Sequence, residues 1–165
     1  MNIDSFPLEL ETQDDAPAIE ALAALVFGPG RFTRTAFRLR EGVPQVPELS
    51  FVVRNGNALL GSVRLTTVKI DHMQGLLLGP LVVAPEFKNA GIGRKLMWQA
   101  VKSAKEQNYP WIILVGDEPY YSRFGFEIVK RGSVKLPGPV DPDRLLICEL
   151  DKAACKDLSG LATSS

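Results

Sequence analysis

A strand, a glycine-rich turn and a helix follow one another in residues 76–107, and this segment constrains the fold more than any other. Residues 76–83 form an apolar run that is too short for a buried helix and is followed by Pro85, which favours a strand. After Gly91 the apolar residues recur with a helical period. They form one face, made of Met97, Ala100, Val101 and Ala104. The sequence therefore predicts a strand that passes through a tight turn into an amphipathic helix.

The charges at the start of this helix are the reverse of the usual arrangement. A helix N-terminus carries a partial positive charge and unpaired N–H groups, so acidic residues are favoured there. Here Arg94 and Lys95 occupy the first turn, and Lys88 lies just before it. Gly91 and Gly93 would let backbone N–H groups approach an anion closely. The pattern favours a phosphate site over the alternative, a solvated basic turn whose glycines only permit a bend.

Two common phosphate-binding motifs do not fit this turn. The dinucleotide fingerprint requires a glycine where this chain has Leu96. No GxxxxGK string followed by Ser or Thr occurs in the chain. Residues 88–93, KNAGIG, instead resemble the Gln/Arg-x-x-Gly-x-Gly/Ala signature of the GNAT superfamily of N-acetyltransferases, with Lys88 at the first position. Residues 81–85, LVVAP, are similar to the Leu-x-Val-x-Pro pattern that precedes it in that family.

The resemblance implies that acetyl-coenzyme A is the cosubstrate. In the family this loop holds the pyrophosphate, and the preceding strand accompanies the pantetheine arm. The resemblance implies that the residues at the matching positions bind the cofactor. These residues are Leu81, Val82, Val83, Lys88, Asn89, Ala90, Gly91, Ile92, Gly93 and Arg94.

Gly79-Pro80 interrupts the strand in residues 76–83. Proline cannot donate to a strand ladder, so it belongs at a bulge or at an edge. A GNAT-like fold implies that this strand splays from its neighbour, and that backbone N–H groups near Val83 polarise the acetyl carbonyl. The alternative is an edge strand with a bend.

A second motif, YYSRFGF in residues 120–126, strengthens the resemblance. GNAT members commonly carry Tyr-x-x-x-Gly-Phe, and Tyr121 matches its tyrosine. The resemblance implies that Tyr121 is a general acid that protonates the departing thiolate; the alternative is an aromatic core anchor. We assign Tyr120 to packing. No motif marks a general base, for which the candidates are Asp117, Glu118 and His72.

The remaining segments predict a single α/β (α+β) domain of the GNAT type. It has a mixed, mostly antiparallel sheet of about six to seven strands, flanked by about four helices and splayed between the fourth and fifth strands. Besides residues 76–83, strands are expected in residues 8–12, 50–54, 58–70, 111–115 and 145–150, and another is expected to start at Phe126. A helix is expected in residues 16–27. The domain is expected to span residues 1–155, and residues 156–165 to form a disordered tail.

Three arginines follow the first predicted helix at helical spacing. Arg31, Arg34 and Arg38 are three and four residues apart, which would place them on one helical face. In the GNAT family this region lines the acceptor pocket, so Arg31, Arg34 and the nearby Phe32 are the predicted substrate-binding residues. The alternative is a solvated basic face.

Bulk properties restrict the partners. The 165 residues include 19 basic and 19 acidic residues, so no net charge recruits nucleic acid or a membrane surface. The N-terminus lacks the features of a signal peptide, and two cysteines without CxxC spacing predict no metal site. We expect a cytoplasmic N-acetyltransferase for a small-molecule or peptide amine, and many relatives are homodimers. The alternatives are a non-catalytic acyl-CoA sensor and a regulatory protein whose arginines dock an acidic surface.

Overall fold

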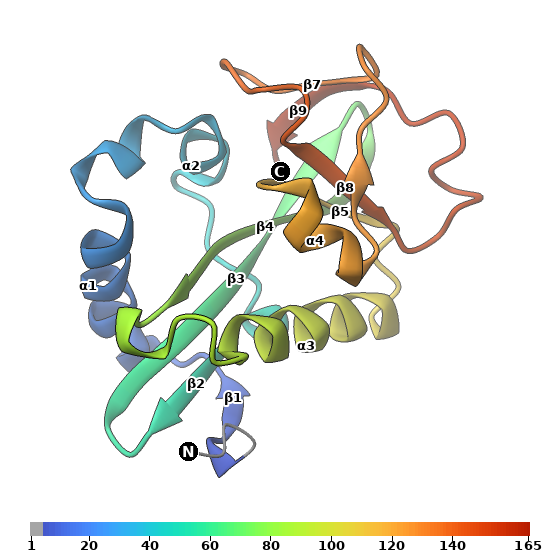
Figure 1. Ribbon diagram of the computed structural model, residues 1–165. Coiled ribbons are helices and arrows are strands. Elements are labelled where there is room, and N and C mark those ends of the chain that lie inside the picture. The colour runs from blue at the N-terminus through green and yellow to red at the C-terminus, as the bar shows by residue number, and fades with distance from the viewer. Residues whose placement is uncertain (1–4) are drawn as a thin grey trace.

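One sheet organises the chain, as the computed structural model of residues 5–165 shows (Figure 1). Its main path runs β1-β2-β3-β4-β5-β8-β6, and β9 pairs with both β3 and β7. Most pairs are antiparallel, and β4–β5 and β7–β9 are parallel. The strands are β1 (Leu8–Leu10), β2 (Phe51–Asn55), β3 (Ala58–Ile70), β4 (Met73–Val83), β5 (Trp111–Val115), β6 (Glu127–Ile128), β7 (Val134–Lys135), β8 (Leu145–Glu149) and β9 (Gly160–Ser164).

Helices cover both faces of the sheet (Figure 1). The α-helices are α1 (Ala16–Phe27), α2 (Thr35–Arg40), α3 (Ile92–Glu106) and α4 (Glu118–Tyr121). Short 3-10 segments are η2 (Gln13–Asp15), η3 (Pro29–Thr33), η4 (Pro47–Leu49), η5 (Pro85–Phe87) and η6 (Ser122–Phe124). Successive side chains of β4 pack on opposite faces of the sheet, because side chains alternate along a strand. Leu76 and Leu78 pack with Met97 of α3, whereas Leu77 packs in a separate cluster with Leu39 of α2.

The predicted bulge and splay are both confirmed. Opposite β3, the register moves from Val63↔Leu81 to Leu65↔Leu78, so Gly79 and Pro80 together face one residue. Opposite β5, pairing is limited to Leu76↔Ile112 and Leu77↔Ile113 within the described residues. Beyond Leu77, β4 diverges from β5 and leaves an opening between the two strands.

The sheet has more strands than predicted, and the expected disordered tail is wrong. All seven predicted strands are present, and β7 and β9 are added to them. β3 extends past β2, and residues 162–164 of β9 pair with Val68, Lys69 and Ile70 on that edge. Ala162 is fully buried there. The short side chains of this segment suggested fraying, but they suit a strand that covers an otherwise open edge.

The predicted helical face of Arg31, Arg34 and Arg38 is also wrong. Arg31 belongs to η3, and Arg34 has extended backbone angles (φ −68°, ψ 139°) as the residue before α2. The chain therefore bends at Arg34, and the three side chains do not share one helix. None of the helices in residues 5–165 combines the length and the hydrophobicity needed to cross a bilayer.

A buried ion pair joins the start of α1 to the sheet. Arg54 of β2 donates from both terminal nitrogens to the Asp15 carboxylate, with Nη2 to Oδ2 at 2.8 Å. The Asp15 side chain is only 5% exposed. The bond from Arg54, together with one from the Thr12 backbone, lowers the pKa of Asp15 from 3.8 to about 2. A lowered pKa means that the pair stabilises the fold above pH 4 and is lost as the pH falls toward 2.

We predict that Asp15→Asn lowers the free energy of unfolding by roughly 2 kcal/mol at pH 7, the value that corresponds to this pKa shift. The difference between wild type and variant should shrink between about pH 4 and pH 2, because the wild-type carboxylate becomes protonated there. Denaturant unfolding of both proteins across this pH range measures the difference. The exposed neighbour Asp14 provides the control Asp14→Asn, which should change little. A difference that stays constant down to pH 2 contradicts the assignment.

Candidate active site

The N-terminus of α3 lacks the side chains that usually complete a helix start. Gly91 precedes the helix in the left-handed region (φ 97°), and Asn89 also has a positive φ of 65°. No side chain caps the helix, and its first turn holds no acidic residue. The unpaired N–H groups and the helix dipole together favour a bound anion. The turn has the shape and polarity that the sequence predicted for a phosphate site.

The predicted cofactor residues divide into two kinds. The side chains of Lys88, Asn89 and Arg94 are exposed around the turn. Those of Val82 and Ile92 are buried in the core, so these two residues can contribute only backbone groups. Lys95 does not serve the turn, because its Nζ donates to the carbonyl of Phe6 at 2.7 Å.

Gly93 links the turn to the splayed strand. A Cβ at this position would lie 2.9 Å from the Tyr120 hydroxyl, 3.6 Å from a methyl of Val83 and 4.0 Å from a methyl of Leu81. The absence of a side chain at Gly93 therefore lets the Tyr120 hydroxyl of α4 approach the first turn of α3 closely, beside Val83 and Leu81 of β4.

The N–H groups of β4 alternate between β3 and the opening. The N–H of Ala84 donates to Leu60 of β3 at 2.8 Å. Since groups alternate along a strand, Val82 faces the same way, and the N–H groups of Leu81 and Val83 face the opening. Pro80 has no N–H. The N–H groups of Leu81 and Val83 thus point into the region where β5 no longer pairs with β4.

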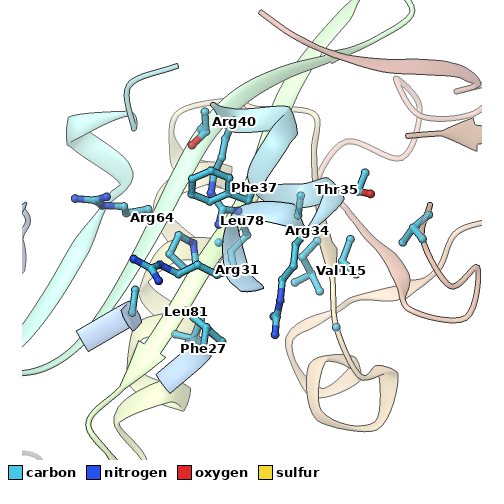
Figure 2. A pocket seen from close by; sticks show the side chains of 18 of the residues that line it. Phe27, Arg31, Arg34, Thr35, Phe37, Arg40, Arg64, Leu78, Leu81 and Val115 are labelled. Atoms are coloured by element: carbon cyan, nitrogen blue, oxygen red, sulfur yellow. The ribbon is translucent and has the colours of Figure 1, made fainter. Parts of the chain in front are cut away.

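A cleft of about 750 Å³ begins at this opening and extends toward α1 and α2. The bulge at Gly79-Pro80 and the side chain of Leu81 form its floor, and Figure 2 shows its arginine-rich wall. Tyr120 and Tyr121 from α4 also line it. The arginines of the wall are Arg31, Arg34, Arg40, Arg64 and Arg144.

Most of these arginines are neutralised within the protein. Arg64 donates to Glu11 at 2.6 Å, and Arg144 donates to Asp117 at 3.3 Å. Arg31 donates to the carbonyl of Gly28 at 2.8 Å. Its guanidinium also lies 3.9 Å from Glu20, which is equally far from Arg64.

Several predicted residues lie outside the cleft wall. Phe32 packs edge-on against Phe37 at 5.0 Å between ring centroids, and of these two residues Phe37 lines the cleft. Arg38 and Glu118 do not line it. His72 is 97% exposed beside Asp71 in the turn between β3 and β4. Of the three candidate bases, the cleft wall includes Asp117 alone.

Tyr121 is the more enclosed of the two cleft tyrosines. Its ring covers Gly116, where a Cβ would lie 2.4 Å from a ring carbon, and packs edge-on against Phe126. Burial, followed by the neighbouring Tyr120 and Asp117, raises the pKa of Tyr121 to about 12. The phenol is therefore protonated at neutral pH and can act as a hydrogen-bond donor.

Sequence reasoning missed the positions of Tyr120 and Arg40. Tyr120 was assigned to packing, but its hydroxyl lies at Gly93 and its ring packs against Tyr121 and Phe124. Arg40 belongs to the same basic segment as Arg31 and Arg34. The three- and four-residue spacing gave no reason to single out Arg40, whose place in the cleft follows from the bend at Arg34.

Comparisons with known proteins agree with this geometry. The family model described as "Acetyltransferase (GNAT) domain" matches residues 47–128. The uncharacterised N-acetyltransferase YhbS of Escherichia coli K12 is 26% identical over 156 residues, covering 93% of each chain. A second E. coli K12 protein, the uncharacterised N-acetyltransferase YjhQ, is 24% identical over 77% of this chain and 72% of its own length.

Solved structures give the same result for the fold. The crystal structure of E. coli YhbS in complex with CoA superposes with a TM-score of 0.82 at 25% identity, covering 97% of this chain and 89% of YhbS. A GNAT family acetyltransferase from Brucella melitensis, in complex with acetyl-CoA, has a TM-score of 0.61 at 23% identity over 86% of this chain and 94% of its own. The splayed sheet, the uncapped helix turn and these similarities together show that the chain belongs to the GNAT family of N-acetyltransferases.

Proposed function

We propose that this protein transfers an acetyl group from acetyl-CoA to a primary amine of a small molecule or peptide. The observation that carries the proposal is the uncapped start of α3, whose Gly93 lies beside Leu81 and Val83 in the part of β4 that β5 does not pair with. The relatives crystallised with CoA and acetyl-CoA support the choice of cosubstrate. The domain expected over residues 1–155 would include β9 as well, because β9 completes the edge of β3.

The residues present fit the cosubstrate. The backbone N–H groups around Gly91, Ile92 and Gly93 would bind the pyrophosphate, with Lys88 and Arg94 nearby as cations. Val83 would hold an amide group of the pantetheine arm through the N–H group that β5 leaves free. Gly93 lies beside Leu81 and Val83 and so brings these two parts together.

Acetyl-CoA supplies an activated acetyl thioester when bound. The N–H of Leu81, next to the bulge, would polarise the thioester carbonyl. The acceptor nitrogen must be neutral to attack, and it releases a proton to solvent or to a carboxylate of the cleft. Tyr121 would donate its phenolic proton to the departing sulfur and recover one from water. Because its pKa of about 12 exceeds that of a thiol, near 8.5, this transfer has to accompany cleavage of the C–S bond.

The first prediction concerns Gly93→Ala. Alanine is favoured over glycine in helices by roughly 1 kcal/mol, so α3 should remain folded. Its Cβ would lie 2.9 Å from the Tyr120 hydroxyl, so it should displace Tyr120 and weaken CoA binding by about tenfold or more. Calorimetric titration with CoA measures the effect. Gly30→Ala is the control, because a Cβ at Gly30 meets no atom within 4 Å. Unchanged CoA binding by Gly93→Ala would remove Gly93 from the cofactor site.

The second prediction concerns Tyr121→Phe. Loss of a general acid should lower kcat by about a hundredfold or more, with the Kd for CoA unchanged. Steady-state release of free thiol with a panel of amines measures it. The control is Tyr109→Phe, since Tyr109 packs against the core and does not line the cleft.

The pH dependence of the wild-type enzyme tests the same role. A general acid works while protonated, so with a pKa of about 12 the contribution of Tyr121 persists below that pH. We expect no loss of kcat between pH 8 and pH 10. If Tyr121→Phe retains full turnover, the proton comes from another group. If CoA binds and no amine is acetylated, the data favour an acyl-CoA sensor instead.

A further inference from the structure

Arg40 differs from the paired arginines of the cleft, which are Arg31, Arg64 and Arg144. Within residues 5–165, its guanidinium has no hydrogen bond and no ion pair, although the side chain is half-buried. Its Cζ lies 5.6 Å from the centre of the Phe37 ring. Its Nη1 lies 3.4 Å from the place that a Cβ on Gly79 would occupy. The unpaired charge is therefore held directly over the bulge where the two strands separate.

The surroundings of Arg40 are positive. Burial, followed by the nearby charges of Arg64 and Arg34, lowers the pKa of Arg40 to about 10, while Glu20 acts in the opposite direction. Glu20 is already shared between Arg31 and Arg64. The other acidic residues of the wall are solvent-exposed, namely Glu41, Asp117 and Asp141. A buried cation among like charges is unfavourable unless an anion completes the site.

The anion that fits is a carboxylate. One unpaired half-buried guanidinium matches one negative charge, and its planar fork matches the two oxygens of a carboxylate. The other arginine of the cleft wall that has no ion pair within residues 5–165, Arg34, is exposed, and its guanidinium lies 5.1 Å from the centre of the Phe27 ring. A polyamine would be repelled by the same wall.

The position of Arg40 also limits the length of the acceptor. Gly79 precedes Leu81 by two residues, a separation of roughly 7 Å along a strand. If Leu81 polarises the carbonyl that the amine attacks, the carboxylate held at Gly79 must be a few bonds from that amine.

We propose that the acceptor is a small amino acid, whose carboxylate binds Arg40 while its amino group receives the acetyl group. This inference rests on the acetyltransferase function proposed above. Arg40 is then the residue that selects among amines, and the neutralised arginines around it shape the wall.

The test measures thiol release from acetyl-CoA with pairs of amines, namely glycine, β-alanine and other free amino acids, each beside its carboxamide. At least one carboxylate should be used with a kcat/KM roughly ten- to a hundredfold above that of its amide, the range expected for a charge-assisted hydrogen bond. The amide carries the less basic amine, which favours its attack, so this preference cannot arise from amine basicity.

Arg40→Gln should remove the preference by raising KM for the carboxylate substrate, with CoA binding retained as evidence of folding. Arg40→Lys keeps the charge and loses the planar fork of the guanidinium, so its preference for carboxylates should lie between those of wild type and Arg40→Gln. Arg38→Gln on the same helix is the control, because Arg38 is exposed and does not line the cleft.

The outcomes separate the two proposals. Acetylation of amides or simple amines as fast as of amino acids overturns the carboxylate inference and leaves acetyl transfer intact. A preference for carboxylates that survives in Arg40→Gln also overturns the role of Arg40. If wild type binds CoA and acetylates no amine, the proposed function fails, and the inference that rests on it fails with it.

Discussion

The separation of β4 from β5 is the constraint on which the site depends. Two parallel strands that remain paired satisfy each other's backbone groups and leave nothing for a ligand. Here pairing stops after Leu77, and the bulge at Gly79-Pro80 turns the following residues away. The N–H groups of Leu81 and Val83 then face an opening rather than a neighbouring strand. Burial on the other side of β4 holds this arrangement, since Val82 and Ala84 pack against Leu22 and Ala23 of α1.

The two ends of the opening differ in how they carry positive charge. At the start of α3 the charge comes from backbone N–H groups, with mobile cations at the surface. In the cleft it comes from guanidinium groups that are fixed by their partners, as Arg64 is by Glu11. Backbone donors suit a diphosphate that every acetyltransferase of this family shares. Fixed side chains suit discrimination between one acceptor and another.

Local sequence patterns predicted the features that local geometry determines. The period change after Gly91, the proline in β4 and the glycine turn each depend on neighbouring residues, and each appears in the structure. Features that depend on distant contacts were missed or wrong. The short side chains of β9 give no strand pattern, and only the exposed edge of β3 explains why they pair.

The predictions for the site divide in the same way between local patterns and distant contacts. The tyrosine motif identified Tyr121, but the approach of the Tyr120 hydroxyl to Gly93 joins α4 to α3 and follows from packing. Likewise, helical spacing grouped Arg31, Arg34 and Arg38, whereas the bend at Arg34 turns α2 so that Arg40 reaches Gly79. A periodic pattern cannot reveal a break that no proline or glycine marks.

That bend has an evolutionary consequence. Because the chain changes direction at Arg34, the cleft wall on α2 is a short insert fastened by Leu39 to the core and by Thr35 to the carbonyl of Pro139. Apart from Arg40, which reaches Gly79, its remaining side chains are not anchored to β4 in the part of the chain that the structure describes. Substitutions within this six-residue helix can therefore alter the acceptor side of the cleft and leave the turn before α3 as it is.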